Sequence, residues 1–311
     1  MRTKVLAVAF NPSLDKTVCV DRWIRGQEMR CQESVVRPGG KAINVARTLR
    51  LLDVDAGVWG VAAGVAGHKL ASLLKAEGLE QEWCWTEGET RTNLTVLEQA
   101  SGRVTRILEP GPRTAAAFCR KASGSFAKYL RCLNAVVFSG SLPPGMPPST
   151  LAGFIRSARQ ANVLTALDAS RAALSAGLRA RPFLVKPNRD EAEEFCGFPI
   201  RTRAGIIKAL GCLAQHSNIV LISLGKDGLA GSDGVRMFWA RGPVVRQGAT
   251  VGCGDAALAG FLSGFLKGDV MENCMRLAVA CGTANVGASL PGSAGRRQVN
   301  DIYKRVKVER L

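Results

Sequence analysis

The regular alternation of strand-like and helix-like segments is the feature that most limits how this chain can fold. Short apolar runs are separated by segments whose apolar residues recur at helical spacing. A βαβα order favours a parallel sheet with helices on both faces, since each parallel connection needs a crossover. Right-handed crossovers then bring the carboxyl ends of the strands, and the ligands, to one edge of the sheet. The expected strands are residues 5–10, 57–62, 135–138, 163–167, 183–185 and 219–223, and the expected helices are residues 41–52, 66–77, 148–160, 171–177, 190–215 in two pieces, and 256–266.

Two stretches interrupt this alternation. Residues 17–36 and 82–108 contain alternating polar and apolar residues with no helix between them, which is typical of antiparallel strands. We expect these strands to lie outside the main sheet and to form a small projecting sheet, a lid, with ordinary edge hairpins as the alternative. The lid strands would come from about residues 12–38 and 82–110 of a single domain that spans residues 1–311.

The composition favours a packed globular protein of the cytoplasm. Hydrophobic residues make up 47% of the chain and charged residues 22%. The apolar run at residues 256–266 is too short to cross a bilayer, and the run at residues 5–10 is too short for a signal-peptide core, so we expect no membrane partner. The ten cysteines form no Cys-x-x-Cys pair and only two histidines accompany them, so we expect free, mostly buried thiols and no zinc site.

The formal net charge of +17 is compatible with two kinds of ligand. A basic surface binds nucleic acid through its phosphates, and it also attracts small phosphorylated substrates. The basic residues are not gathered into a tail or a long run, and aromatic residues make up only 6% of the chain, so no stacking platform is visible. We therefore expect small phosphorylated substrates and no nucleic-acid partner.

The strongest local signal is the sequence TVGCGD at residues 250–255, which leads into the apolar helix. Glycines let the backbone approach a ligand closely, and a helix that begins here would point free N–H groups at an anion. Asp255 at such a position either caps the helix or accepts a proton from an attacking hydroxyl. The loop is not a P-loop, because the pattern Gly-x-x-x-x-Gly-Lys-Ser/Thr is absent.

Two further loops have the composition of a sugar site. Gly39 and Gly40 precede an expected helix with Lys41 and Asn44 in its first turn, which would permit donors and acceptors close to sugar hydroxyls. The alternative is a glycine-rich turn with a solvated lysine. Asp15 follows the first strand at the ligand edge, where it would accept from two hydroxyls, unless it only stabilises a proline-containing turn. A loop at residues 138–145 follows another strand and is either on the ligand side or merely a turn.

Two loops later in the chain have the composition of a nucleotide site. Asn188 and Glu191 follow an expected strand three residues apart, where they would hold a hydrated Mg²⁺ or simply form a capping box. The sequence SLGKDG at residues 223–228 would contact nucleotide phosphates or turn a hairpin into residues 229–232.

The order and context of these motifs resemble those of the ribokinase-like (PfkB-type) carbohydrate kinases over essentially the whole chain. The likeness is greatest to the branch that acts on hexose phosphates, 1-phosphofructokinases and tagatose-6-phosphate kinases. The residues that carry it are 11–15, 39–41 with Asn44, 91–93, 139–145, 186–188 with Glu191, 223–225 and 252–255.

This resemblance implies a three-layer αβα fold with a mainly parallel central sheet and a β-sheet lid. It also implies the activity of an ATP-dependent kinase. Asp255 would be the general base, and the backbone N–H groups of Gly252, Cys253 and Gly254 would stabilise the transferring γ-phosphoryl group. The sugar would be held by Asp15, Gly39, Gly40, Lys41, Asn44, Asn93 and Ser139, with Arg91 reaching the phosphate it already carries; ATP would be bound by Lys186, Asn188, Ser223, Gly225, Gly228, Thr250 and Asn285; and Mg²⁺ would be held by Asn188 and, through water, by Glu191.

The chain departs from the family pattern at two positions. Ala42 stands where glycine is common and Cys253 where alanine is usual. We expect activity to survive both, and a helix N-terminus would lower the thiol pKa of Cys253 and make it oxidisable. The alternatives to a ketohexose-phosphate kinase are a kinase of neutral sugars or nucleosides and a non-catalytic sugar-phosphate sensor. A homodimer through the lid is a further expectation.

Overall fold

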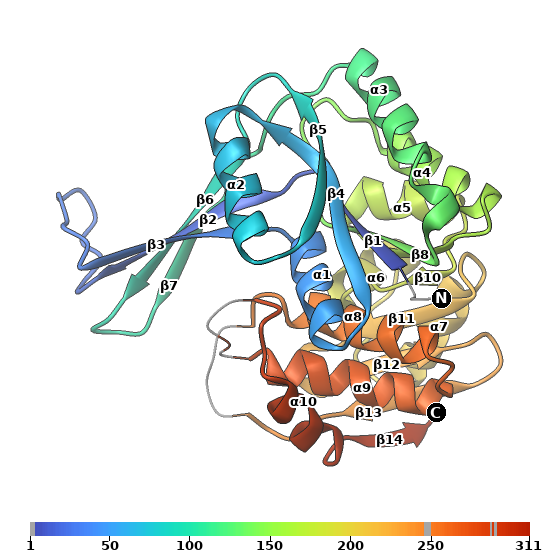
Figure 1. Ribbon diagram of the computed structural model, residues 1–311. Coiled ribbons are helices and arrows are strands. Elements are labelled where there is room, and N and C mark those ends of the chain that lie inside the picture. The colour runs from blue at the N-terminus through green and yellow to red at the C-terminus, as the bar shows by residue number, and fades with distance from the viewer. Residues whose placement is uncertain (1–3, 246–249, 287, 289–290) are drawn as a thin grey trace.

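The computed structural model describes residues 4–245, 250–286, 288 and 291–311 (Figure 1). Its largest element is a ten-stranded sheet, which the helices cover on both faces. The strands in spatial order are β14 (Lys307–Arg310), β13 (Met237–Arg241), β12 (Leu229–Ser232), β11 (Ile219–Ser223), β10 (Leu184–Val185), β9 (Leu164–Asp168), β8 (Ala135–Ser139), β1 (Lys4–Ala9), β4 (Asp55–Ala63) and β5 (Glu80–Thr86).

The sheet is parallel from β5 to β11 and antiparallel from β11 to β14. Strand β1 lies next to β8 and β4, and its residues Val5 to Ala9 are all buried, as both-face coverage requires. The mainly parallel central sheet is therefore confirmed. The loops that follow β1, β8, β9, β10 and β11 leave the sheet at its carboxyl edge, where the predicted ligand residues come together.

Helices pack on the sheet in two layers. One hydrophobic cluster joins α3 to α7 with one face of the sheet, and two others join α1, α2, α8, α9 and α10 with the opposite face. The expected three-layer αβα architecture is thereby confirmed. The helices are α1 (Lys41–Leu51), α2 (Gly64–Ala76), α3 (Ala116–Ala127), α4 (Pro148–Gln160), α5 (Arg171–Arg179), α6 (Arg189–Cys196), α7 (Arg203–Ala214), α8 (Cys253–Leu266), α9 (Met271–Ala284) and α10 (Arg296–Tyr303), with short 3-10 turns at Leu130–Cys132 and Gly225–Asp227.

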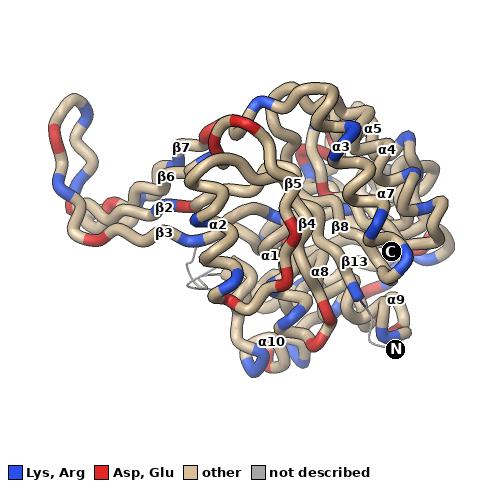
Figure 2. The backbone as a smooth tube through the Cα atoms, turned by 45° about the horizontal axis from the view of Figure 1, so that its top comes forward, with Lys and Arg blue, Asp and Glu red and all other residues tan. Residues whose placement is uncertain are grey.

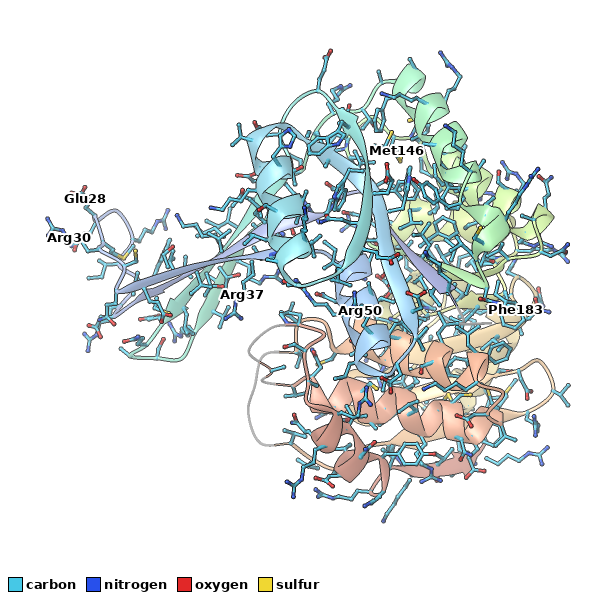
Figure 3. All side chains as sticks on the ribbon, in the orientation of Figure 1. Glu28, Arg30, Arg37, Arg50, Met146 and Phe183 are labelled. Carbon is cyan, nitrogen blue, oxygen red and sulfur yellow. The ribbon has the colours of Figure 1, made fainter. Side chains whose placement is uncertain are left out.

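A separate four-stranded sheet projects from the body (Figure 1). Its order is β3 (Glu33–Gly39), β2 (Ser13–Val20), β6 (Arg91–Glu98) and β7 (Val104–Ile107). Glu28 and Arg30 mark its far tip, whereas Arg37 lies nearer the body (Figure 3). We call this sheet the lid.

The structure corrects two expectations about the lid. Strand β5 is not part of it, because Glu80–Thr86 pairs in parallel with β4 at the edge of the large sheet. As an edge strand, β5 has alternating exposure, which imitates the pattern of a free antiparallel strand. The lid is also not wholly antiparallel, since β2 and β6 run parallel over eight residue pairs.

Over the same described residues, no helix is both long and apolar enough to cross a membrane. All ten cysteines are free, and four of them are buried.

Candidate active site

Asp255 lies in the first turn of α8 with its side chain directed toward α1. The helix begins at Cys253 after Gly252, which has a left-handed φ of 79°, and no side chain caps it. Asp255 is 5% exposed, and its Oδ2 accepts a hydrogen bond of 2.8 Å from Asn44 Nδ2. The capping alternative therefore fails, because the carboxylate contacts the helix that follows the Gly39–Gly40 turn instead of its own backbone.

Asp168, at the carboxyl end of β9, joins two lysines that come from distant parts of the chain. Its Oδ1 lies 3.0 Å from Lys41 Nζ and its Oδ2 lies 3.0 Å from Lys186 Nζ. Asp168 and Lys186 are almost completely buried, whereas Lys41 remains partly exposed. Sequence reasoning missed Asp168, although a carboxylate directly after a buried parallel strand was a usable signal.

The charges around these groups separate the pKa values of the two aspartates. Burial raises the pKa of Asp255, the negative charge of Asp168 raises it further, and Lys41, Asn44 and Lys186 only partly oppose this, so the pKa is about 6. Burial also pushes the pKa of Asp168 upward, but Lys186 and Lys41 outweigh it and lower the value to about 2. Asp168 mainly, and Asp255 to a lesser extent, raise the pKa of Lys41 well above its usual value. Asp255 is thus a carboxylate suited to accept a proton near neutral pH, whereas Asp168 stays ionised.

Lys186 lies directly beside the start of α8. Its Nζ is 3.3 Å from the point that a Cβ on Gly254 would occupy. The amides of Gly254 and Asp255 belong to the first helical turn and have no acceptor within the helix. The amide of Cys253 is less available, because it donates to the Thr250 carbonyl at 3.3 Å. An anion at this position would meet backbone N–H groups and a buried ammonium together.

The buried side chain of Asn285 fixes the loop that contains Gly252, just before α8. Its Nδ2 donates to the Val251 carbonyl at 2.9 Å, and its Oδ1 accepts from the Gly292 amide at 2.6 Å. The side chain is 2% exposed. These two contacts position the glycine loop, and the expected contact of Asn285 with the nucleotide stays a prediction.

At the root of the lid, Asp15 is fixed by neighbours on two strands. Its Oδ1 accepts hydrogen bonds from Ser13 Oγ at 2.7 Å and from Asn93 Nδ2 at 2.9 Å. Gly39 of β3 pairs with Ser13, two residues before Asp15, and any Cβ at Gly39 would overlap the Asp15 carboxylate. Glycine is needed at this position so that Asp15 can lie against the backbone.

A cavity of about 210 Å³ opens beside these residues. Arg91 enters it from β6, with Nε and Nη2 donating to the Asn11 carbonyl at 3.1 and 2.8 Å and Nη1 to the Glu109 carbonyl at 3.4 Å. Two guanidinium N–H groups remain for a ligand. The buried Asn11 Oδ1 and Ser139 Oγ have no hydrogen-bond partner. The lining residues include Asn11, Gly40, Lys41, Ala42, Arg91, Ser139, Ser141 and Ser170.

The two loops predicted to bind nucleotide also serve the local fold. Asn188 and Glu191 form a capping box at the start of α6, with Asn188 Oδ1 accepting from Glu191 N at 2.9 Å and Glu191 Oε2 accepting from Asn188 N at 2.9 Å. Gly225 and Gly228 turn the hairpin between β11 and β12. Ser223 forms a bridge with Asn188, so the two loops lie side by side.

Neither departure from the family pattern blocks the site. Ala42 is 1% exposed and lines the cavity without filling it. Burial, with a smaller contribution from Asp255, raises the pKa of the Cys253 thiol, and the hydrogen bond from Asn285 only partly offsets this. The expectation of a lowered thiol pKa is therefore wrong, because burial outweighs the hydrogen bond from Asn285.

The family model for pfkB family carbohydrate kinases matches residues 9–295. The chain belongs to the pfkB family. The match includes every predicted site residue described above.

Curated relatives and solved structures agree with this assignment. The chain is 31% identical over 313 residues to a 1-phosphofructokinase of Vibrio cholerae, which covers all of this chain and 98% of that protein. It is 26% identical to a tagatose-6-phosphate kinase of Staphylococcus epidermidis over 98% of this chain and 99% of the relative. The phosphofructokinase-2 of Escherichia coli in complex with fructose 6-phosphate superposes with a TM-score of 0.88 at 28% identity, over 97% of this chain and 98% of that one.

Proposed function

We propose that this pfkB family kinase transfers the γ-phosphoryl group of ATP to a hydroxyl of a ketohexose phosphate and forms the bisphosphate. Fructose 1-phosphate, tagatose 6-phosphate and fructose 6-phosphate are the candidate acceptors. The observation that carries the proposal is the position of the Asp255 carboxylate, beside the amides that open α8 and bonded to Asn44 of the sugar-side helix. Phosphoryl transfer depends mainly on positioning and charge neutralisation, and both are built into this arrangement.

Asp255 would act as the general base. It accepts the proton of the sugar hydroxyl as the new O–P bond forms and the bond to the ADP oxygen breaks. Its pKa of about 6 leaves it ionised at neutral pH and basic enough to bind the proton in the transition state. Asn44 fixes the carboxylate through one oxygen and leaves the other for the hydroxyl.

Positive groups would neutralise the negative charge of the transferring group. Lys186 and the amides of Gly254 and Asp255 converge at the start of α8, and Lys41 reaches the same region from α1. Asp168 holds both ammonium groups in place. A preorganised set of donors of this kind stabilises the transition state without reorganisation cost.

At the sugar end, we assign Asp15 and Asn93 to sugar hydroxyls and Arg91 to the phosphate of the acceptor. Asn11 Oδ1 and Ser139 Oγ are buried and unpartnered, so a hydroxyl would satisfy each of them. Gly39 and Gly40 let the backbone and Asp15 approach the sugar. Two free guanidinium N–H groups match two phosphate oxygens, which favours a phosphorylated sugar over a neutral one.

At the nucleotide end, we assign Asn188, Ser223, Gly225, Gly228 and Thr250 to ATP, because they lie in loops at the carboxyl edge. Among the described residues, no group of three or more His, Cys, Asp or Glu side chains is arranged so that it could hold a metal ion. That fits Mg²⁺, which keeps several waters and takes few protein ligands, so Glu191 through water and Asn188 would hold it. Bound there, the ion would neutralise phosphate charge.

The test is a screen of ADP release, coupled to an indicator reaction, against the three ketohexose phosphates, free fructose, free tagatose and a nucleoside. We expect at least one ketohexose phosphate to exceed every neutral acceptor in kcat/KM. A preference for neutral acceptors would support the sugar or nucleoside kinase alternative. Binding of a sugar phosphate without ADP release would support the sensor.

We also propose that the protein forms a homodimer through the lid in the cytoplasm. Val104 and Ile107 of β7 and the following Leu108 are each more than half exposed, and an open sheet edge readily pairs with a second copy. Sedimentation of the purified protein tests this, and replacement of Val104 and Ile107 by Lys should yield monomers.

A further inference from the structure

The positive charge of this chain is concentrated in one quarter of its length. Residues 110–189 contain twelve Lys or Arg residues and a single acidic residue, Asp168. Asp168 is buried between two lysines and contributes nothing to the surface. This segment therefore accounts for most of the net charge of +17.

The fold gathers this charge on one side of the molecule. The segment forms α3, α4 and α5, which lie side by side over one face of the sheet (Figure 1). Lys and Arg follow these helices, as Figure 2 shows. Ten of the cations are exposed, and together they define what we call the basic face: Arg113, Arg120, Lys121, Lys128, Arg131, Arg156, Arg159, Arg171, Arg179 and Arg181.

Nothing in the described part of the chain neutralises the basic face. None of its ten cations forms a salt bridge, whereas elsewhere Arg47, Arg241, Arg276 and Arg296 each pair with a carboxylate. The acidic residues nearest to the basic face lie at its edges: Glu82 of β5 lies near the end of α3, and α6, which is rich in acidic residues, follows α5. Unpaired like charges repel one another, so the face would be stabilised by an anionic partner.

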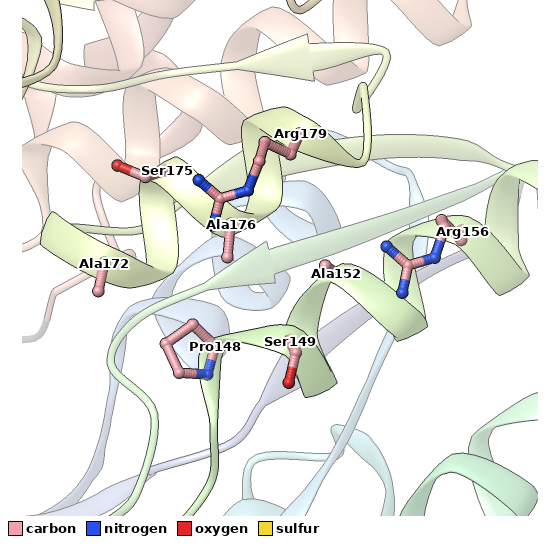
Figure 4. A pocket seen from close by; sticks show the side chains of 8 residues that line it. All are labelled: Pro148, Ser149, Ala152, Arg156, Ala172, Ser175, Ala176 and Arg179. Atoms are coloured by element: carbon pink, nitrogen blue, oxygen red, sulfur yellow. The ribbon is translucent and has the colours of Figure 1, made fainter.

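The centre of the basic face is a groove between α4 and α5 (Figure 4). It has a volume of about 660 Å³. Arg156 projects into it from α4 and Arg179 from α5, while Ala152, Ala172 and Ala176 form a floor of small side chains. Such a floor lets a ligand lie close to the helices while both guanidinium groups reach its charges.

The chemistry of the face favours a phosphate backbone over other anions. Eight of its ten cations are arginines, whose planar guanidinium binds phosphate through two parallel hydrogen bonds. Among the described residues, no exposed large hydrophobic side chain lies between residues 110 and 189. Insertion into a membrane and stacking on bases both need such side chains, whereas contact with a sugar-phosphate backbone does not.

We propose that the basic face binds the phosphate backbone of a nucleic acid, independently of the base sequence. The expectation of no nucleic-acid partner rested on the absence of a basic tail or run and on the low aromatic content. The proposal differs from it because folding brings the cations of three helices together on one surface. The proposal does not depend on the kinase activity, because the ten cations lie outside the residues assigned to catalysis and substrate binding.

The test measures binding of the full-length protein to a fluorescent 20-base-pair DNA duplex by anisotropy between 50 and 200 mM salt. We expect micromolar affinity at 50 mM salt and a slope of log K against log[salt] of about −4 or steeper, since each neutralised phosphate contributes about −0.9. The triple variant R120Q/R156Q/R179Q should bind at least tenfold more weakly, with a slope shallower by about three. The three substituted side chains are exposed, so the core should stay intact. The triple variant should therefore keep the melting temperature and the kinase activity of the wild type.

The matched control, R297Q/K304Q/R305Q, removes three exposed cations from the opposite layer. It should keep the wild-type slope. Equal loss in both triple variants would overturn the proposal, because net charge alone would then explain binding. Tighter binding of phosphatidylserine vesicles or polyglutamate than of the duplex, again lost only in the first variant, would overturn it in favour of a membrane or an acidic protein.

Discussion

Asn44 and Asp255 are 211 positions apart in the chain, yet Asn44 Nδ2 donates a hydrogen bond of 2.8 Å to Asp255 Oδ2. Asn44 belongs to α1, which follows the sugar-side glycine turn, and Asp255 belongs to α8, which follows the phosphate-side glycine loop. One hydrogen bond thus joins the two halves of the candidate site. In the proposed reaction, it fixes the base at the point where the attacking hydroxyl and the transferred group would meet.

Replacing Asp255 with Asn should lower kcat about 10²-fold or more, because the amide cannot accept the proton. KM for the sugar phosphate should change little. The variant should melt no lower than the wild type at pH 8, since a carboxylate whose pKa is raised by burial destabilises the folded state when ionised. Steady-state kinetics and thermal melting check this, with Asp233→Asn as the control.

The pH profile of kcat/KM should fall on the acid side with a midpoint near pH 6. Asp255 must be ionised to accept a proton, and its pKa is raised from 3.8 to about 6, so activity is present above pH 6 and drops about tenfold per unit below it. An acid limb centred near pH 4 would contradict the assignment of Asp255 as the base.

Replacing Asp168 with Asn should move this acid limb to lower pH. The substitution removes a negative neighbour of Asp255 but keeps Lys41 and Lys186, so the pKa of Asp255 falls.

The variant Asp168→Asn should also lose roughly 3–5 kcal/mol of stability at neutral pH, because two ammonium groups lose their buried partner. Since the pKa of Asp168 is lowered to about 2, its stabilisation is present above pH 4 and lost as the pH falls through 2. Kinetics and urea denaturation measure both effects, and an unmoved limb would count against the coupling.

Replacing Arg91 with Ala should raise KM for the sugar phosphate roughly 10-fold to 100-fold, the loss expected for a hydrogen bond to a charged group. The KM for a neutral sugar should stay the same. Arg103→Ala, an exposed position on the lid, is the matched control. If Arg91→Ala and Asp255→Asn both lowered only kcat, and by the same factor, the two assigned roles would be wrong.

Replacing Asn285 with Ala should lower kcat about tenfold and leave both KM values nearly unchanged. The Gly292 amide and the Val251 carbonyl lose their buried partner, which costs about 1–3 kcal/mol and lets the glycine loop shift. Melting and kinetics together distinguish the outcomes: loss of stability with an unchanged kcat would show that the loop does not need this support.

The parts of the site that depend on local sequence were predictable, and those that depend on distant partners were not. Gly39, Gly40 and Asp255 stand out because paired glycines before a helix and an aspartate at a helix start are visible in a short stretch of sequence. Asp168 closes an ordinary apolar strand, and its importance comes only from Lys41 and Lys186, which the fold brings to it. Likewise, capping and catalysis both place an aspartate at a helix start, so only the contact with Asn44 separated them for Asp255.

The fold was predictable for the same reason. Buried parallel strands such as β1 and β8 are continuous apolar runs, and helical spacing marks the crossovers between them. Edge strands lack this signal. Strand β5 alternates like a free hairpin strand and was therefore placed in the lid, although it closes the large sheet.

The lid strands begin or end at the residues assigned to the sugar: Asp15 lies near the start of β2, Gly39 at the end of β3, and Arg91 at the start of β6. The lid and the wall of the sugar site are therefore built from the same strands, which come from two segments of the chain. Exchanging this sheet between two members of the family should therefore also transfer the preference for the acceptor. The residues of α8 that are proposed for phosphoryl transfer would remain those of the recipient protein.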